Sequence, residues 1–346
     1  MTATTLIETV LPGAVEPDGP ELRTRDLPDP AEGRVVLRMD ATGVSFAEQQ
    51  MRRGTYHDRP PFPFVPGYDL VGTVTAVGPG ADSALAGRRF AAVTRTGARA
   101  SHLLVDAVDL MPVPDGVDAV AAETVLVNGN TAWQMLHRVA EVRAGGTVVV
   151  LGANGGVGST LVQLARAAGI TVTGTASERH HATVGATPVD RRDPDMYTRI
   201  RELAPDGVDA VSDHVSDHVA GPGLEQSWQL LRRGGVPVPY GSAATKDDDG
   251  NSQLPWRKLF ARLAAWNSLP NGRRAQFCAF WAGRRRCRTA WQQRMAEDLA
   301  QVPRLVADGA LVPRIAAAVP LRDAASALKL AESHTVAGKV VIVPGA

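Results

Sequence analysis

Glycines recur in one short segment with a spacing that suits the binding of a phosphate. The segment Gly152-Ala153-Asn154-Gly155-Gly156-Val157-Gly158 follows the apolar run 147–151 and precedes apolar residues at helical spacing over 159–168. A strand, a glycine-rich turn and a helix in this order let the backbone approach a pyrophosphate, whose charge the helix N-terminus favours. The alternative is a strand-to-helix turn that binds no ligand. We predict a dinucleotide site whose turn residues are Asn154, Gly155, Gly156, Val157 and Gly158.

The end of the next strand indicates which nicotinamide cofactor binds. An NAD site usually carries Asp or Glu about 20 residues after the glycines, where the carboxylate holds the adenosine ribose. Here Gly174-Thr175-Ala176-Ser177 occupies that position, and Glu178, Arg179 and His180 follow. Because a hydroxyl followed by a cation suits a 2′-phosphate, we predict NADPH, bound by Ser177, Arg179 and His180. The alternative is that Arg179 is a solvated charge at the start of a helix.

Two different patterns surround these residues and predict two domains. Over the first ~125 residues, short strands such as 34–39 and 70–77 are separated by turn signals, which indicates an all-β unit. From about residue 128, strands alternate with amphipathic helices, as in a doubly wound parallel sheet. The segment 259–288 interrupts this alternation. Residues 339–343 predict a last strand of the kind that returns to the first domain, and the fold class is α/β.

The composition excludes several classes of protein. The 346 residues include 37 Lys+Arg and 36 Asp+Glu, a balance that gives no large field to attract nucleic acid or an anionic membrane. Two cysteines are too few for a disulfide scaffold or a four-cysteine zinc lobe. The sequence shows neither a signal-like start nor an apolar run of about 18 residues. We expect a cytoplasmic protein without nucleic-acid or membrane partners. The basic run 284–288 predicts a solvated helix start or an oligomer edge, with nucleic-acid binding as the alternative.

Several segments together resemble the medium-chain dehydrogenase/reductase superfamily, in particular its zinc-independent quinone oxidoreductase-like and enoyl reductase-like branch. They include LGANGGVGSTLVQLAR and AGKVVIVP, and they lie at residues 43–80, 130–136, 151–166, 207–215 and 337–344. The resemblance implies a GroES-like β-barrel catalytic domain over residues 1–126 and 290–346, and a Rossmann NADPH-binding domain over residues 127–289. It also implies a cleft between the domains and a homodimer formed through the Rossmann sheet edge, near residues 275–281.

The resemblance also implies the remaining site residues. Zinc-dependent relatives place Cys and then His-Glu around a catalytic metal, but this chain has Ser45 and Tyr68-Asp69 at those positions, so we predict no metal. His214 and His218, with Asp213 and Asp217, form an alternative metal cluster if they lie on a helix. The predicted cofactor-binding set also contains Asn128, Thr131, Val215, Gly241, Ser242 and Lys339.

Chemistry without a metal needs a proton donor from the protein. Alcohol oxidation loses the Lewis acid that stabilises an alkoxide, whereas hydride addition to an activated C=C bond needs an oriented acceptor and a proton. In related enoyl and quinone reductases a tyrosine follows an Arg-x-Gly stretch, and here it is Tyr56. A phenol stays protonated at neutral pH and donates to a carbonyl oxygen or enolate. We predict Tyr56 and Ser45 as catalytic residues, with packing alone as the alternative for each.

These observations predict an NADPH-dependent reductase that transfers hydride to an α,β-unsaturated carbonyl compound or a quinone, that is, to a small hydrophobic substrate. Two alternatives stay open. The polar residues 128–130 permit reductive or redox-neutral cyclisation of a natural product on the same fold. A non-catalytic NADPH-binding protein would bind the cofactor without oxidising it.

Pro237 and Pro239 lie in what should be a central strand, where proline removes ladder hydrogen bonds. They therefore predict an altered geometry on the cofactor side of the sheet.

Overall fold

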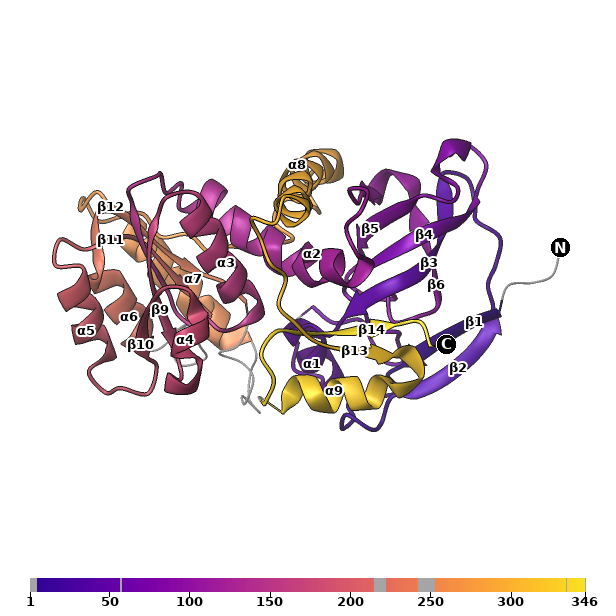
Figure 1. Cartoon of the computed structure of the whole chain (residues 1–346), viewed down its shortest axis with the longest axis horizontal. Helices are drawn as coiled ribbons and strands as arrows, with labels where there is room; N and C mark the ends of the chain where they lie inside the picture. The colour runs from indigo at the N-terminus through magenta and orange to yellow at the C-terminus, as the bar shows by residue number, and fades with distance from the viewer. Residues whose placement is uncertain (1–4, 57, 215–221, 242–252, 334, 346) are drawn as a thin grey trace. The chain divides into compact units, whose positions relative to one another are not determined.

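The computed structural model describes residues 5–56, 58–214, 222–241, 253–333 and 335–345. The chain divides into two units, which are described separately. Unit 1 comprises Met1–Val127 and Arg288–Ala346, and unit 2 comprises Asn128–Cys287. In Figure 1 the indigo-to-purple start of the chain and its yellow end both belong to unit 1.

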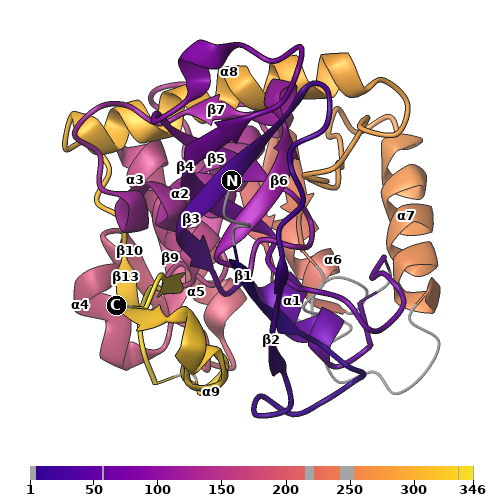
Figure 2. The same cartoon turned by 90° about the vertical axis from the view of Figure 1, so that its right-hand side faces the viewer.

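Strands dominate unit 1. A seven-stranded sheet runs in the order β13-β14-β3-β4-β5-β7 with β6 also paired to β3, and β1 and β2 form a separate two-stranded ribbon, seen in Figure 2. The strands are β1 (Thr5–Val10), β2 (Glu21–Asp26), β3 (Arg34–Gly43), β4 (Asp69–Val77), β5 (Arg89–Val93), β6 (His102–Asp106), β7 (Met111–Pro112), β13 (Ile315–Pro320) and β14 (Lys339–Val343). All pairs are antiparallel except β13 with β14.

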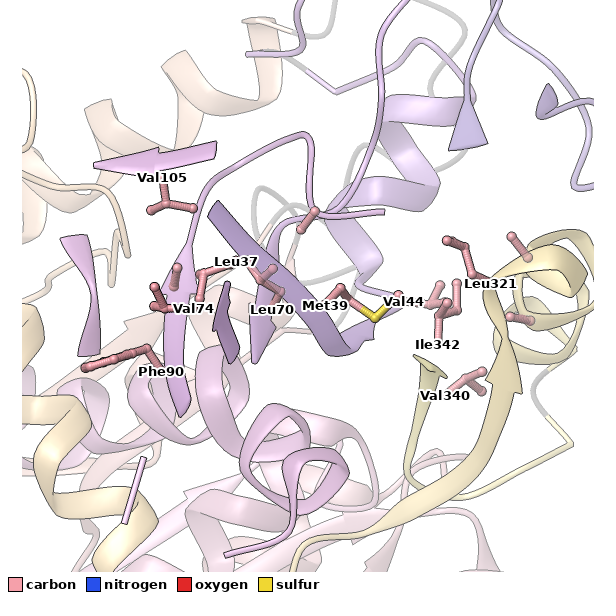
Figure 3. Packing of buried hydrophobic residues seen from close by; sticks show 14 of the residues in the cluster. Leu37, Met39, Val44, Leu70, Val74, Phe90, Val105, Leu321, Val340 and Ile342 are labelled. Carbon is pink, nitrogen blue, oxygen red and sulfur yellow. The ribbon is translucent and has the colours of Figure 1, made fainter. Parts of the chain in front are cut away.

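The C-terminal segment completes the core of unit 1. Val35, Leu37 and Met39 of β3 belong to one buried cluster, and Met39 packs near Val44, Leu321, Val340 and Ile342, as Figure 3 shows. The helices of this unit are α1 (Phe46–Arg52), α8 (Arg288–Ala307), α9 (Ala324–Glu332) and the first part of α2 (Ala119–Trp133). The two ends of the sequence therefore share one apolar core, which confirms the predicted return of the last strand.

Unit 2 is built on a parallel sheet with the order β10-β9-β8-β11-β12. Its strands are β8 (Thr147–Val150), β9 (Thr171–Ala176), β10 (Thr187–Asp190), β11 (Val208–Asp213) and β12 (Leu231–Pro239). Its helices are α3 (Gly156–Ala167), α4 (His181–Val184), α5 (Met196–Leu203), α6 (Pro222–Gln229) and α7 (Gln253–Asn267). Val149 and Val211 pack with Ile200 of α5, whereas α3 contacts β8 and β9. These contacts are those of the doubly wound arrangement that the sequence predicts.

Pro237 and Pro239 differ from the sequence expectation in their position and in their effect. They lie in β12, the last strand of this sheet, and their carbonyls accept from the N–H groups of Gln276 (3.4 Å) and Cys278 (2.9 Å). Because the N and C=O of one strand residue point the same way, the missing donors face residues 274–278 and not β11. The hydrogen-bond ladder between β12 and β11 is therefore intact. On the other side of β12, alternate residues of 274–278 donate their N–H groups to carbonyls of β12 but receive no N–H from the two prolines.

The segment 259–288, which interrupts the predicted alternation, contributes the second part of α7 and two members of an aromatic cluster in unit 2. The rings of Trp228 and Trp266 stack with centroids 4.5 Å apart, and Trp256 meets Phe277 edge-on at 5.2 Å. These rings surround buried leucines of α6 and α7. Aromatic pairs of this kind stabilise a core, so Trp256 and Trp266 pack in unit 2.

Candidate cofactor and catalytic sites

Two glycines of the turn in unit 2 lie so close to their neighbours that a Cβ atom would collide. The turn joins β8 to α3, which begins at Gly156. A Cβ atom at Gly158 would collide with the backbone carbonyl of Gly152, and one at Gly156 would lie 2.5 Å from the side-chain nitrogen of Asn128. Gly155 is the N-cap residue and has no side chain to cap the helix. The turn therefore offers the N–H groups at the start of α3 to a ligand, as a pyrophosphate requires.

The end of β9 holds this turn in place. The N–H of Gly152 donates to Thr175 Oγ1 at 3.0 Å, and the N–H of Ala153 donates to the Thr175 carbonyl at 2.8 Å. The Thr175 side chain is buried. The phosphate turn and the end of the second strand thus form one rigid feature, to which the Asn128 side chain adds from α2.

The predicted 2′-phosphate residues follow β9 directly. Ser177 is buried, Arg179 is exposed and His180 is half-buried. The Arg179 Nε donates to Nε2 of His180 at 3.1 Å, so the two side chains lie together. The backbone N–H of Arg191, after β10, donates to the Ala176 carbonyl at 3.0 Å and brings a second arginine to this loop. The Arg191-Arg192 pair, which directly follows β10, is a basic signal in the sequence that could have identified it.

The other predicted cofactor residues that the structure describes in unit 2 lie on α2 and just after β12. Thr131 is buried on α2, and Gly241 has a φ of 74°, which favours glycine. A Cβ atom at Gly241 would collide with the His214 ring, which lies 4.8 Å from the Tyr240 ring. Burial lowers the pKa of His214 to about 4, so the imidazole is neutral at pH 7. Val215 and Ser242 lie outside the described residues.

The alternative metal cluster is only partly within the described residues. Asp213 and His214 are described, whereas Asp217 and His218 are not. Asp213 ends β11 and its carboxylate accepts from Ser227 Oγ at 3.3 Å. Elsewhere among the described residues, no three His, Cys, Asp or Glu side chains gather in the way that a metal ion needs.

Tyr56 lies in unit 1, just beyond α1. Its backbone N–H donates to the Gln50 carbonyl at 3.3 Å, and its hydroxyl forms a hydrogen bond with Tyr68. Burial raises the pKa of Tyr56 above its ordinary value, and the hydrogen bond from Tyr68 and the charge of Arg95 oppose that rise. Tyr56 is therefore a protonated phenol at neutral pH, as a proton donor must be.

Ser45 is the N-cap residue of α1 and takes part in a capping box. Its hydroxyl oxygen accepts from the Glu48 N–H at 3.2 Å, and its own N–H donates to the Glu48 carboxylate at 2.7 Å. The Glu48 carboxylate also accepts from Arg99 at 2.8 Å, and both of these side chains are fully buried. The contacts assign Ser45 a structural role at the start of α1, while its hydroxyl proton remains available to a partner.

Lys339 lies inside unit 1 between two buried carboxylates. Its ammonium donates to Glu123 at 2.6 Å and to Asp69 at 3.2 Å. A Cβ atom at Gly43 would overlap with Lys339 and Glu123, so glycine makes room for the pair. Burial raises the pKa of Glu123 to about 8, although Lys339 opposes the rise. Burial lowers the pKa of Lys339, but the two carboxylates outweigh it, so the ammonium stays charged. The predicted cofactor role of Lys339 stays a prediction.

Comparison with known proteins identifies the family. Residues 31–137 match the alcohol dehydrogenase GroES-like domain, and residues 184–342 match a family described as zinc-binding dehydrogenase. The human synaptic vesicle membrane protein VAT-1 homolog is 31% identical over 331 residues, which cover 92% of this chain and 81% of that protein. The human quinone oxidoreductase is 31% identical over 238 residues, covering 66% and 71%.

The chain belongs to the medium-chain dehydrogenase/reductase superfamily. Its relatives place it in the quinone oxidoreductase-like branch, and the predicted α/β class with a GroES-like domain and a Rossmann-like parallel sheet is confirmed. A solved structure of a mycobacterial protein complexed with NADPH has a TM-score of 0.80 and is 27% identical, covering 98% of this chain and 100% of that one.

Tyr68 and Asp69 have hydrogen-bond partners that the sequence did not predict. Tyr68 bonds to Tyr56, and Asp69 bonds to Lys339. Asp69 and Lys339 are 270 residues apart in the chain, so no local pattern could have paired them. Tyr68 did carry a signal, because a tyrosine at the position of a metal-binding histidine offers a hydroxyl to the same place.

No helix in the described part of the chain combines the length and the apolar character needed to cross a membrane. The cytoplasmic location stays a prediction.

Proposed function

We propose that this medium-chain reductase is an NADPH-dependent enzyme that reduces an activated C=C bond of an α,β-unsaturated carbonyl compound, or a quinone. The observation that carries the proposal is the turn from Gly152 to Gly158, held against β9 by Thr175 and followed by the Ser177–His180 loop. The relatives named quinone oxidoreductase and the mycobacterial structure with NADPH support it.

The residues of unit 2 fit this cofactor. The glycine turn would hold the pyrophosphate through the N–H groups of α3, and Asn128 would add a side-chain amide beside them. Arg179, His180 and Arg191 would meet the 2′-phosphate, since the only acid in the Ser177–His180 loop is the exposed Glu178. Thr131 and Gly241 would face the nicotinamide side. When bound, NADPH supplies the hydride of the reaction.

Unit 1 supplies the proton. We assign Tyr56 as the hydrogen-bond donor to the substrate carbonyl oxygen, where negative charge develops as the C=C bond is reduced. Transfer of the proton leaves a phenolate that the Tyr68 hydroxyl and the Arg95 charge stabilise. Ser45 and Tyr68 carry hydroxyls where zinc-dependent relatives carry metal ligands, so this donor set favours hydrogen bonding over metal binding.

The experiment is a panel of enones, quinones and enoyl thioesters offered to the full chain with NADPH, scored by loss of cofactor absorbance. We expect oxidation with at least one class. Tyr56→Phe should lower kcat roughly 100-fold, the usual scale for a lost general acid. Tyr197→Phe is the control, because that hydroxyl donates to the Gly223 carbonyl in unit 2. Tight NADPH binding with no oxidation of any substrate would favour the non-catalytic alternative.

The predicted homodimer can form through the outer edge of unit 2 only if the backbone groups of that edge are released from their present hydrogen bonds. The Ala275 N–H donates to Asn267 Oδ1 at 2.7 Å, and Asn267 Nδ2 donates to the Ala275 carbonyl at 2.9 Å. The N–H and the carbonyl of Ala275, at the start of the predicted dimer edge, are thus both bonded to Asn267 of α7. Sedimentation of the wild type and of Asn267→Ala tests this directly, and we expect any edge-paired dimer to be stronger in the variant.

A further inference from the structure

One arginine of unit 1 is completely buried and is paired with a buried acid. Arg99 is 1% exposed, and its guanidinium donates to the Glu48 carboxylate at 2.8 Å, where Glu48 is 1% exposed as well. Arginine is rarely buried to this extent, and removing both charges from water is costly. Apolar side chains of similar volume often stabilise such a place equally well, so stability alone does not explain the pair. What the pair adds is a fixed direction for each of its bonds.

The Glu48 end of the pair holds the residue at the start of α1. One carboxylate oxygen takes the bond from Arg99, and the other accepts from the Ser45 N–H at 2.7 Å. The Glu48 N–H in turn donates to Ser45 Oγ at 3.2 Å. The oxygen of the half-buried Ser45 hydroxyl is therefore fixed by the cap, while the cap makes no use of the hydroxyl proton. Arg99 thus acts on Ser45 through one intervening side chain.

The backbone of Arg99 holds the loop that leads into β4. Its N–H donates to the Pro66 carbonyl at 3.0 Å, and its carbonyl accepts from the Thr9 N–H of β1 at 3.0 Å. A Cβ atom at Gly67, whose φ is 108°, would lie 2.2 Å from the Arg99 nitrogen, so this close approach needs glycine. Tyr68 and then β4 follow Gly67 directly. One buried residue therefore joins the start of α1 to the loop before Tyr68.

We propose that Arg99 is a positioning residue, which holds Ser45 through Glu48 so that the Ser45 hydroxyl donates a hydrogen bond to the carbonyl oxygen of the substrate. The inference rests on the proposed function, because it assumes that this oxygen gains negative charge as hydride is added. Ser45 keeps its proton, and Tyr56 remains the proton source. The expected contribution is that of one hydrogen bond to a developing charge, roughly tenfold in kcat.

The test removes the Arg99 contact without leaving an unpaired charge. In Glu48→Gln/Arg99→Met, the glutamine still accepts from the Ser45 N–H, so the capping box is kept and the arginine bond is lost. Glu8→Gln/Arg25→Met is the matched control, because it makes the same two changes at a pair that joins β1 to β2 with a 3.1 Å contact. Circular dichroism checks that both double variants are folded. Arg99→Lys, which keeps a cation beside Glu48, is the second variant if the first does not fold.

Hydrogen exchange gives a readout that needs no substrate. Mass spectrometry of the peptide that contains residues 45–52 should show faster exchange in Glu48→Gln/Arg99→Met than in wild type, because the start of α1 has lost its anchor. Arg99→Lys should show a smaller increase, since the charge is kept but the planar fork is not. Exchange of this peptide should be unchanged in the control.

Kinetics with a substrate from the panel give the second readout. Glu48→Gln/Arg99→Met should lower kcat roughly tenfold with KM for NADPH unchanged, while the control leaves both unchanged. Ser45→Ala should lower kcat by a similar factor. In the Ser45→Ala background the same two changes should lower kcat by less than about twofold, because residues that act as a unit do not add their effects.

The outcomes separate this inference from the proposed function. Unchanged exchange in a folded Glu48→Gln/Arg99→Met, or in a folded Arg99→Lys, overturns the positioning role. An unchanged kcat in Ser45→Ala, or a full tenfold loss when the pair is removed in that background, shows that Arg99 does not act through Ser45 and also overturns it. Faster exchange in a chain that binds NADPH but oxidises no substrate keeps the anchor of α1 and overturns the proposed function, together with the catalytic part of the inference.

Discussion

Two sets of charged side chains, one in each unit, lie in opposite environments. In unit 1 the pairs Lys339 with Asp69 and Arg99 with Glu48 are almost completely buried. In unit 2 Arg179 is exposed on the loop after β9, beside the half-buried His180. A buried charge that loses its partner is costly, whereas an exposed charge contributes little to stability. The difference indicates that the buried pairs hold the structure of unit 1, whereas the exposed charge of Arg179 contributes little to the stability of unit 2.

The largest expected effect is at Lys339. Lys339→Met leaves the buried Asp69 carboxylate and the neighbouring Glu123 carboxyl group without their cation, so the free energy of unfolding should fall by about 3–5 kcal/mol. Urea unfolding of the wild type and the variant measures this loss. Lys329→Met is the control, because Lys329 and its partner Asp18 are both exposed, and its loss should stay below about 1 kcal/mol. Equal losses in the two variants would contradict the comparison.

The pH dependence of unit 1 sharpens the same comparison. Because burial raises the pKa of Glu123 from 4.5 to about 8, the folded chain binds a proton that the unfolded chain has released. Stability from this group is therefore lost as pH rises between those values, by up to about 1.4 kcal/mol per pH unit. Glu123→Gln removes that slope. Its stability relative to wild type should be higher at pH 8.5 than at pH 5.5, and a flat difference would rule the mechanism out.

Alanine substitutions in the glycine turn of unit 2 should have effects that depend on which atoms the added Cβ meets. Gly158→Ala meets the backbone of Gly152 and should cost about 1–3 kcal/mol and weaken NADPH binding. Gly156→Ala meets only the side chain of Asn128, so Asn128→Ala should relieve the clash in the double variant. Unfolding and cofactor titration of the two glycine variants, each with and without Asn128→Ala, check this. Relief of the Gly158→Ala defect by Asn128→Ala would show that the contacts are wrongly assigned.

The smallest effect on stability is expected at Arg179. Arg179→Ala should change the free energy of unfolding by less than about 0.5 kcal/mol, because the side chain is exposed. Its NADPH affinity should fall roughly tenfold, the scale of a charge-assisted hydrogen bond. Arg201→Ala, an exposed arginine of α5, should change neither quantity. A loss of stability without a loss of affinity would give Arg179 the structural role that unit 1 charges have.

The sequence allowed the local features to be predicted because they depend on neighbouring residues. The strand, turn and helix around Gly155 follow from glycine spacing and apolar periodicity. The partners of Lys339 and Tyr68 depend on strand pairing between distant parts of the chain, which no period in the sequence reports. The position of Pro237 was wrongly expected in a central strand, because composition alone does not tell which side of a strand faces a neighbour.

The central claim is that unit 2 binds NADPH through a cationic 2′-phosphate site. Dissociation constants for NADPH and NADH, measured at one salt concentration for wild type and Arg179→Ala, test it most directly. The account predicts tighter binding of NADPH by wild type, with most of that preference lost in Arg179→Ala. Equal affinities, or tighter binding of NADH by wild type, would contradict it.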